Sequence, residues 1–424
     1  MTTLAIIGTG IAGLGCAHFL HQRFDLTLFE QNDYVGGHTN TVEADEGGKT
    51  VPIDTGFMVY NEVTYPNLTR LFRELQVRVK PTTMSFSVQH IPTGLEFCGS
   101  SINHLFAQRR NLLRPRFLIM LAKIDRFNKE AVDALNEHRF QNYTVQQYIQ
   151  ERQYGDDLLN LYLIPMSSAV WSTPPDKMLE FPAVTLLRVF YNHGFLGLYT
   201  QHPWLTVDQG AKSYVAKITA PFHQKIRVNQ PVVRVTRTSN QVAIQTRDGA
   251  TQTFDKVIFA CHGDQALRLL GDATPDEHRL LSAFSYQPNL AILHTDASLM
   301  PQRRLAWSSW NYRIELDERG KVSPTTIYWM NSLQGVSDKQ NYFVSINGEH
   351  RINPQRILKR IAYEHPLFSL KAINAQFELP KLNQISPLQT TYFCGSYFRY
   401  GFHEDALTSA LELSRTITGK PIWK

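Results

Sequence analysis

The chain has 424 residues, of which 43% are hydrophobic and 19% are charged. This length and composition predict two or three domains, each with its own buried core, and exclude a disordered chain, a collagen and a disulfide-stapled miniprotein. The formal net charge is only +6, so the position of the charges says more about partners than their sum does.

The four cysteines favour reduced thiols over a disulfide framework or a metal site. Cys16, Cys98, Cys261 and Cys394 lie far apart in the sequence and form no Cys-x-x-Cys pair. We therefore expect buried, reduced thiols and a cytoplasmic location. No run of about 18 apolar residues predicts a membrane-spanning helix. The apolar N-terminus lacks the basic leader of a signal peptide, so export is not expected.

The first predicted elements form the beginning of a βαβ unit. Residues 3–7 have the pattern of a short buried strand, residues 11–22 that of a helix, and residues 26–30 that of a second strand. From about residue 67 to residue 195 the pattern becomes mostly helical, most clearly at 117–135 and 158–164. The opening order predicts a parallel sheet.

The later elements return to strands. Residues 227–260 show strand-like runs separated by turn signals, which predict a β-meander followed by a strand over 256–260 that rejoins the parallel sheet. A last strand over 391–394 leads into a helix over 404–417. The cofactor domain is thus expected to combine separated pieces of the chain.

A glycine-rich motif separates the first strand from the first helix. In Gly8-Thr9-Gly10-Ile11-Ala12-Gly13, the first glycine allows a tight turn, the second lets the backbone approach a pyrophosphate, and the third lets the helix pack closely on the strand. The helix N-terminus then offers free N–H groups to the phosphates. Such a motif can also be an ordinary glycine-rich turn.

The residue at the end of the second strand favours the dinucleotide interpretation. Glu30 follows Gly8 by 22 residues, and a carboxylate there can accept hydrogen bonds from both hydroxyls of an adenosine ribose. Gln31 comes next, and no arginine follows that could accommodate a 2′-phosphate, which argues against NADP.

Two further groups of residues favour a flavin over a nicotinamide. Gly36, Gly37, His38 and Thr39 follow the second strand directly, where an extended flavin cofactor presses against more backbone. A second contact is expected from Asp54, Thr55 and Gly56, although these residues can also form a plain turn between two elements. The expected FAD contacts in these regions are Gly36, Gly37, His38, Thr39, Asp54, Thr55, Gly56 and, at the start of the meander, Val232.

The C-terminal segment repeats the order strand, glycine, loop, helix. A helix N-terminus pointing at the flavin would stabilise the anionic reduced form. Its first-turn acids can equally cap the helix, and its histidine can be a hydrogen-bonding brace. The expected cofactor contacts here are Gly395, Ser396, His403, Glu404, Asp405 and Ala406, and the candidates for catalysis are His403 and Tyr397.

Taken together, these motifs resemble the flavin amine oxidase superfamily, which includes amine oxidases, protoporphyrinogen oxidase and carotenoid desaturases. A closer resemblance covers nearly the whole chain and is to a bacterial branch of FAD-dependent oxidoreductases. That branch is typically encoded beside cyclopropane-fatty-acid synthases and is similar to the flavin domain fused to the plant synthases. The matching segments are residues 54–57, 65–68, 107–113, 191–194 and 400–405.

The resemblance implies an α/β fold with a Rossmann-like FAD-binding domain, its parallel sheet and β-meander, and an inserted α+β substrate domain. We expect the FAD-binding domain to use residues 1–66, 206–270 and 386–424, and the substrate domain residues 67–205 and 271–385. No cysteine matches the covalent attachment site of monoamine oxidases, so non-covalent FAD is expected. Ser396 replaces the acid that amine oxidases often carry after the C-terminal glycine.

The charge is concentrated in one stretch. Between residues 100 and 130 there are seven basic and two acidic residues, interleaved with apolar ones. This stretch can be a solvated basic face or a peripheral contact with the inner membrane surface through Arg109, Arg110, Arg114 and Arg116. No motif for nucleic acid accompanies it.

Aromatic residues suggest an apolar pocket over the flavin. They gather in two groups, which can also be plain core: Trp307, Trp310, Tyr312, Tyr328 and Trp329, then Phe393, Tyr397, Phe398 and Tyr400. Since some relatives are implicated in desaturating methyl-branched acyl chains, we expect removal of a hydride from a fatty acyl lipid. A flavin amine oxidase and a non-catalytic flavoprotein partner of a lipid methyltransferase are the alternatives.

Overall fold

The computed structural model describes residues 1–197, 200–384 and 390–423. Its first sheet is parallel and has the strand order β19-β13-β1-β2-β9. These strands span Thr391–Phe393, Lys256–Phe259, Thr3–Ile7, Asp25–Phe29 and Ile226–Arg227. Strand β1 is central and almost entirely apolar because helices and the meander cover both faces of the sheet. The predicted parallel sheet is confirmed.

The predicted meander is also confirmed, as a three-stranded antiparallel sheet. Its strands are β10 (Val232–Arg237), β11 (Val242–Thr246) and β12 (Thr251–Phe254). The chain then enters β13, which pairs with β1 in parallel. The strands of the parallel sheet thus come from all three segments assigned to the cofactor domain.

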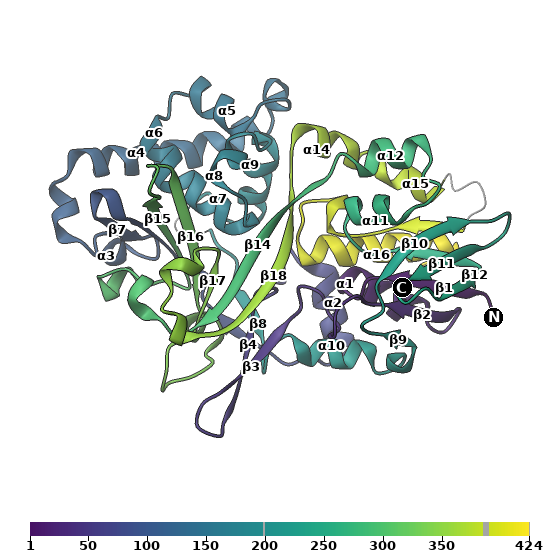
Figure 1. Ribbon diagram of the computed structural model, residues 1–424. Coiled ribbons are helices and arrows are strands. Elements are labelled where there is room, and N and C mark those ends of the chain that lie inside the picture. Colours follow the sequence, from purple (N-terminus) through teal and green to yellow (C-terminus); the bar gives the residue numbers. More distant parts are fainter. Residues whose placement is uncertain (198–199, 385–389, 424) are drawn as a thin grey trace.

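A second, seven-stranded sheet occupies the other half of the molecule (Figure 1), in the order β18-β14-β17-β16-β15-β6-β7. Its strands span Ile357–Leu367, Ser285–His294, Phe343–Ile346, Val322–Trp329, Trp310–Leu316, Phe86–His90 and Leu95–Cys98. The long strands β14 and β18 run side by side from this sheet toward the parallel sheet. These two strands therefore reach from one half of the molecule to the other.

Two two-stranded antiparallel sheets lie beside the larger ones. Strand β3 (Thr41–Asp45) pairs with β4 (Thr50–Asp54), and β5 (Val79–Thr82) pairs with β8 (Trp204–Val207). Because β5 and β6 lie within residues 67–195, the expectation of a mostly helical segment there is wrong for residues 79–98. Strand β6 pairs with β15, which lies more than 200 residues further along the chain.

Helices cover the parallel sheet and cap the seven-stranded one (Figure 1). Those near the parallel sheet are α1 (Ile11–Leu20), α2 (Pro66–Glu74), α10 (Lys212–Thr219), α11 (Gly263–Leu269), α12 (Pro275–Leu281), α14 (Leu370–Gln376), α15 (Leu379–Gln384) and α16 (His403–Thr418). The others are α3 (Ile102–Leu105), α4 (Pro115–Ala134), α5 (Val145–Glu151), α6 (Asp156–Leu158), α7 (Ile164–Trp171), α8 (Pro175–Leu179), α9 (Ala183–Asn192) and α13 (Met330–Gln334).

Helices α1 and α16 pack closely because small residues face each other. A Cβ on Gly15 would lie 3.0 Å from Leu407 Cδ1 and 3.2 Å from Ala410 Cβ. Beneath this contact, Cys16 Sγ and Cys394 Sγ lie 3.6 Å apart as free thiols. All four cysteines are free, as expected, but Cys261 is only partly buried.

Within the described ranges, no helix is both long enough and apolar enough to cross a membrane. The predicted domain boundary at residue 386 falls in residues 385–389, outside the described part of the chain. The other boundaries stay predictions.

Candidate functional site

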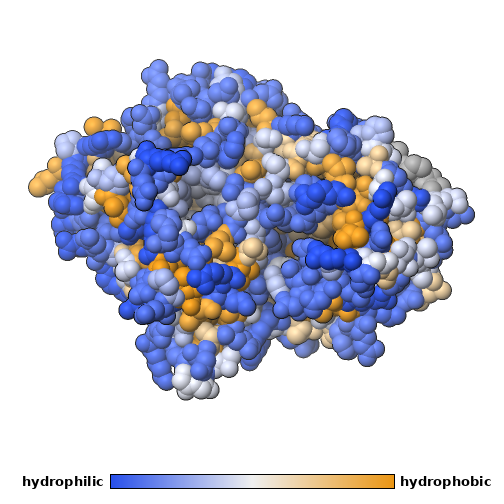
Figure 2. Space-filling model, viewed as in Figure 1, coloured by the Kyte–Doolittle hydropathy of each residue, from blue (hydrophilic) through white to orange (hydrophobic). Residues whose placement is uncertain are grey.

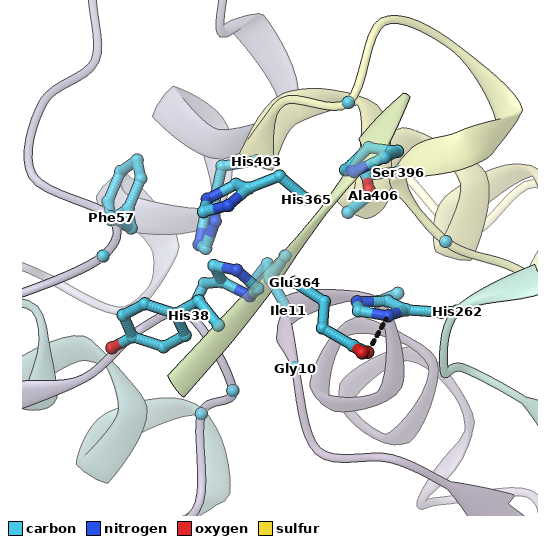
Figure 3. A pocket seen from close by; sticks show the side chains of 18 of the residues that line it. Gly10, Ile11, His38, Phe57, His262, Glu364, His365, Ser396, His403 and Ala406 are labelled. Carbon is cyan, nitrogen blue, oxygen red and sulfur yellow. Dashed lines mark ion pairs between the residues drawn. The ribbon is translucent and has the colours of Figure 1, made fainter. Parts of the chain in front are cut away.

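A cavity of about 1140 Å³ lies where the parallel sheet meets β14 and β18. Residues at the carboxyl ends of β1, β2 and β13 line it, together with the first turn of α16 and the middle of β18. In parallel sheets, ligands bind at this edge because several strand ends open there together. The fold thus positions residues from both ends of the chain around one space (Figure 3).

The three glycines of the N-terminal motif have three different geometries. Gly8 has a φ of +101°, and a Cβ on Gly13 would lie 2.0 Å from the Gly8 carbonyl oxygen. No heavy atom of the described chain lies within 4 Å of a Cβ built on Gly10. Gly8 therefore makes the turn, Gly13 allows close packing inside the protein, and Gly10 leaves backbone open to the cavity.

Glu30 lies buried at the end of β2 and lines the cavity. Its carboxylate accepts hydrogen bonds from the Thr9 N–H at 3.1 Å and from the Asn32 N–H at 2.9 Å. These bonds fix its orientation beside the glycine turn. The Thr9 hydroxyl and the Asn32 side-chain amide donate to the same two oxygens, at 2.5 and 3.0 Å, so a ribose hydroxyl would share these oxygens with the chain's own donors.

His38 follows Gly36 and Gly37, and its ring is half-buried against β18. The ring stacks on Tyr363, with centroids 4.6 Å apart, and meets the His365 ring at 5.1 Å. Its Nε2 has no hydrogen-bond partner in the described chain. Burial, together with the neighbouring histidines, lowers the pKa of His38 well below its usual value. A buried polar atom without a partner at a cavity wall fits a ligand that supplies one.

His403 is held rigidly at the start of α16. Its ring stacks on Phe57 at 3.9 Å, and its Nε2 shares a hydrogen bond of 2.6 Å with the Tyr214 hydroxyl. Burial lowers the pKa of His403 to about 3. The imidazole is therefore neutral at ordinary pH, and the structure favours the brace over the proton carrier. Figure 3 shows His38, His365 and His403 together at the centre of the view.

Most of the residues expected from the sequence to contact the cofactor, and Tyr397, line this cavity. They are Gly8, Gly10, Ile11, Ala12, Glu30, Gln31, Gly36, Gly37, His38, Thr55, Gly56, Val232, Gly395, Ser396, Tyr397, His403 and Ala406. Five others, Gly13, Thr39, Asp54, Glu404 and Asp405, are not among its lining residues.

Glu404 and Asp405 bind other parts of the chain, which corrects the expectation that they contact the flavin. The Glu404 carboxylate accepts hydrogen bonds from the Asn67 and Leu68 N–H groups at 3.0 and 2.9 Å, so it caps α2. Asp405 accepts a bond from the Phe402 N–H at 2.9 Å and closes the first turn of α16. Both acids therefore cap helix N-termini, Glu404 that of α2 and Asp405 that of α16.

Asp54 and Thr39 are also structural. The Asp54 carboxylate accepts the Ala211 N–H at 2.9 Å and a hydrogen bond from the Gln334 amide at 2.6 Å. Burial raises the pKa of Asp54 to about 6, against the opposing effect of these bonds. Thr39 Oγ1 lies 2.7 Å from the Tyr214 hydroxyl and thereby supports the partner of His403.

Several cavity residues were not predicted from the sequence. His262 follows β13 directly, and its Nδ1 lies 3.4 Å from Glu364 Oε2 (Figure 3). His365 lies next on β18 and bonds Asn289 at 2.9 Å. Burial lowers the pKa of His365 to about 4. Because a residue directly after a parallel strand lies at the edge where ligands bind, the sequence position of His262 could have identified it as a site residue. No comparable sequence pattern marks the residues of β18.

The far part of the cavity is apolar and aromatic. Of the first aromatic group, Trp310 and Tyr328 line it. Tyr312 lies in the buried core instead, and Trp307 and Trp329 are partly buried against another core cluster. Of the second group, only Tyr397 lines it. The other walls come from α7, β8, the seven-stranded sheet and the segments after β4, β5 and α9, and they include Met58, Val59, Met84, Val170, Phe195, Trp204, Leu290 and Ile346.

Comparisons with known proteins agree with this architecture. The sequence model of the family described as flavin containing amine oxidoreductase matches residues 11–350. The chain belongs to this family. A search of curated protein sequences finds no significant match. This membership makes the protein an FAD-dependent oxidoreductase, and the resemblance inferred from the motifs is confirmed at the level of the superfamily.

Several solved structures have the same fold. Cyclohexylamine oxidase from Brevibacterium oxydans IH-35A is 16% identical with a TM-score of 0.69, each chain covering 99% of the other. A fatty acid isomerase from P. acnes that produces CLA is 14% identical with a TM-score of 0.68, covering 99% of this chain and 98% of its own. Putrescine oxidase bound to putrescine is 13% identical with a TM-score of 0.65 and 99% coverage of both. At these identities the likeness concerns the fold alone.

The residues around the cavity fit FAD. Open backbone at Gly10 suits a pyrophosphate, Glu30 suits an adenosine ribose, and the unpartnered Nε2 of His38 suits a polar atom of the cofactor. The N-terminus of α16, with Ala406 facing the cavity, suits the electron-rich end of a reduced flavin.

The glycine geometry predicts opposite effects for two similar substitutions. Gly10→Ala should fold normally and weaken FAD binding by about tenfold or more, since the new methyl group projects into the open site. Gly13→Ala should instead lower the free energy of unfolding by about 1–3 kcal/mol or more, because its Cβ overlaps backbone. FAD titration and urea unfolding of both variants measure this. Equal effects of the two substitutions on unfolding would contradict it.

The capping role of Glu404 predicts a loss of stability without a change in flavin environment. Glu404→Ala should lower the free energy of unfolding by about 1–3 kcal/mol, because two buried N–H groups lose their acceptor. Glu412→Ala, on an exposed ion pair of the same helix, is the control and should cost less than about 1 kcal/mol. A shifted flavin absorption spectrum in Glu404→Ala alone would instead place Glu404 at the cofactor.

The lowered pKa of His403 predicts that the stability of the protein depends on pH. Its pKa is about 3 in the folded protein and about 6.5 in an unfolded chain. As the pH falls below about 6.5, the unfolded state binds a proton that the folded state does not, so stability decreases toward acid. In His403→Gln, the loss of unfolding free energy between pH 7 and pH 5 should be smaller. The exposed His350→Gln is the control, and an unchanged loss in His403→Gln would refute the assignment.

Proposed function

We propose that the protein dehydrogenates a neutral, hydrophobic substrate, of which a methyl-branched or cyclopropane fatty acyl lipid is the leading candidate. Bound FAD would supply the hydride acceptor. The shape and polarity of the cavity support this substrate class, as does the resemblance of the chain to oxidoreductases encoded beside cyclopropane-fatty-acid synthases.

The observation that carries the proposal is the shortage of available charge in the cavity. Among its described lining residues, the carboxylates are Glu30 and Glu364. Glu30 lies at the end of β2 with its oxygens already bonded, and Glu364 pairs with His262 and accepts from Gln265 at 3.2 Å. A charged ammonium group would find no free carboxylate there, and burying it unpaired is costly.

The histidines strengthen this argument. Burial lowers the pKa of His193 to about 4, as it does for His365, and that of His403 to about 3. All three therefore line the cavity as neutral rings at ordinary pH. With the methionine and tryptophan side chains they provide a wall that excludes water from a reacting C–H bond.

Different residues of the chain would bind the cofactor, position His403 and align the substrate. The Gly10 backbone and Glu30 would bind the cofactor, and Phe57 and Tyr214 would keep His403 in place at the first turn of α16. The apolar walls would align the substrate chain. A structural relative described as a fatty acid isomerase supports the idea that this fold can accommodate an acyl chain.

Amine oxidation is the second candidate, because putrescine oxidase and cyclohexylamine oxidase share the fold. An amine oxidase would hold a neutral amine between aromatic rings. Here Trp310 and Tyr328 meet edge-on, with centroids 4.8 Å apart and an interplanar angle of 80°, so they do not form two parallel walls. A flavoprotein without turnover, acting as partner of a lipid methyltransferase, is the third candidate.

Anaerobic flavin bleaching separates these candidates. The purified protein is mixed with methyl-branched or cyclopropane phospholipids, and separately with putrescine or cyclohexylamine, and the flavin absorbance is followed. Bleaching by the lipids is expected. Bleaching by an amine alone would establish amine oxidation, and bleaching by neither would favour the non-catalytic partner.

A variant that fills the apolar part of the cavity links the activity to this space. Val170 lies on α7 and lines the cavity. Val170→Phe should lower the rate of lipid-dependent bleaching by about tenfold or more, since overpacking costs roughly 1–3 kcal/mol, while the bound FAD content stays the same. Val322→Phe, at an exposed strand end, is the matched control. Equal rates for the two variants would remove the apolar part from the substrate site.

A further inference from the structure

The first turns of α4 carry apolar side chains on both faces. Phe117 and Met120 are buried against the seven-stranded sheet. Leu118 and Ile119 lie on the opposite, exposed face. A surface helix normally has polar residues on its solvent side, so this end of α4 departs from the expected pattern.

The short helical turn before α4, residues Arg109–Leu113, extends the same exposed apolar surface. Leu112 is 50% exposed and Leu113 is 87% exposed. Ile102, at the start of α3, is exposed as well. We call residues 102–122 the α4 tip. Figure 1 places α3 and α4 at the end of the molecule far from the parallel sheet, and Figure 2 shows apolar side chains at that edge.

The apolar surface stops where α4 becomes charged. From Asp125 onward the exposed face carries ion pairs four residues apart, Arg126–Glu130 and Lys129–Asp125. The same helix therefore has an ordinary solvent face in its second half. The apolar first half is a local feature of the tip and not a general property of the helix.

The tip is also strongly basic. Between Glu96 and Asp125 the sequence has five cations and no acid. The guanidinium groups of Arg109 and Arg110 donate to the carbonyl oxygens of Phe106 and Gly94 and so keep their charge uncompensated. Arg116 differs, because it forms an ion pair of 2.6 Å with Asp157. Arg109, Arg110 and Arg114 are therefore the better candidates for an external anion.

We propose that the α4 tip docks on an anionic phospholipid membrane, with Leu112, Leu113, Leu118 and Ile119 entering the headgroup boundary and the arginines contacting lipid phosphates. The exposed leucines match the apolar part of such an interface, and the cations beside them match its anionic phosphates. A second copy of this chain would bring two basic surfaces together, which charge repulsion opposes. The inference goes beyond the proposed chemistry, since binding a surface requires no turnover.

The tip is connected to the apolar part of the cavity. The buried cluster beneath it contains Phe117, Met120 and Tyr312, and Trp310 packs against that cluster. Trp310 also lines the cavity. Trp310 is thus in contact with both the buried cluster under the tip and the apolar part of the cavity.

Vesicle flotation of the FAD-loaded protein tests the proposal. The protein should float with vesicles of equimolar phosphatidylcholine and phosphatidylglycerol, stay behind with phosphatidylcholine alone, and bind less at higher salt. Replacing Arg109, Arg110 and Arg114 together by Gln should reduce partitioning by about fivefold for each arginine. Leu112→Ser combined with Leu113→Ser should also reduce it strongly.

Matched controls make the test specific. Leu358→Ser removes a leucine that is 48% exposed elsewhere on the surface, and Lys129→Gln removes a cation from the charged half of α4. Both should float like the unchanged protein. Absence of flotation, or equal flotation of the tip variants, would overturn the proposal. So would a dimer that the leucine double variant dissociates, because the tip would then bind a second copy. Protein that floats but shows no flavin bleaching would keep this inference and lose the proposed function.

Discussion

The whole site depends on one edge of the parallel sheet. Strands β1, β2, β13 and β19 run in the same direction, so their carboxyl ends open side by side. This arrangement brings Gly8, Glu30, Cys261 and Gly395 to one cavity although they span nearly the whole chain. Because Gly13 has no side chain, α1 packs directly against the Gly8 turn, and the backbone at Gly10 is open to the cavity. The second sheet reaches this edge through β14 and β18 and closes the cavity from the other side.

Burial sets the chemical character of the space that results. Burial lowers the pKa of the histidines that face it, and neighbouring histidines lower the pKa of His38 and His365 further, so each ring is more stable without its proton. Neutral rings beside methionine and aromatic side chains produce a cavity suited to carbon–hydrogen chemistry on an apolar substrate. The acids that the sequence places near the flavin are used to cap helices and do not alter this character.

Sequence reasoning succeeded where the signal is local. The spacing from Gly8 to Glu30 defines a strand, a turn and a helix, and the structure has all of them. It failed at residues 79–98, because β6 is stabilised by pairing with β15, far away in the sequence. It also misassigned Glu404, since an acid in the first turn of a helix has the same pattern whether it contacts a ligand or, as here, the N-terminus of α2. His365 lies on a long strand whose approach to His38 only the folded chain reveals.

The most direct test of this account is the absorption spectrum of the purified protein after incubation with FAD and removal of unbound cofactor. The account predicts a yellow protein with stoichiometric FAD that is released intact when the chain is denatured, as expected for non-covalent binding in the cavity. A colourless protein that takes up no FAD would contradict it, because the residues gathered at the sheet edge would then have another purpose.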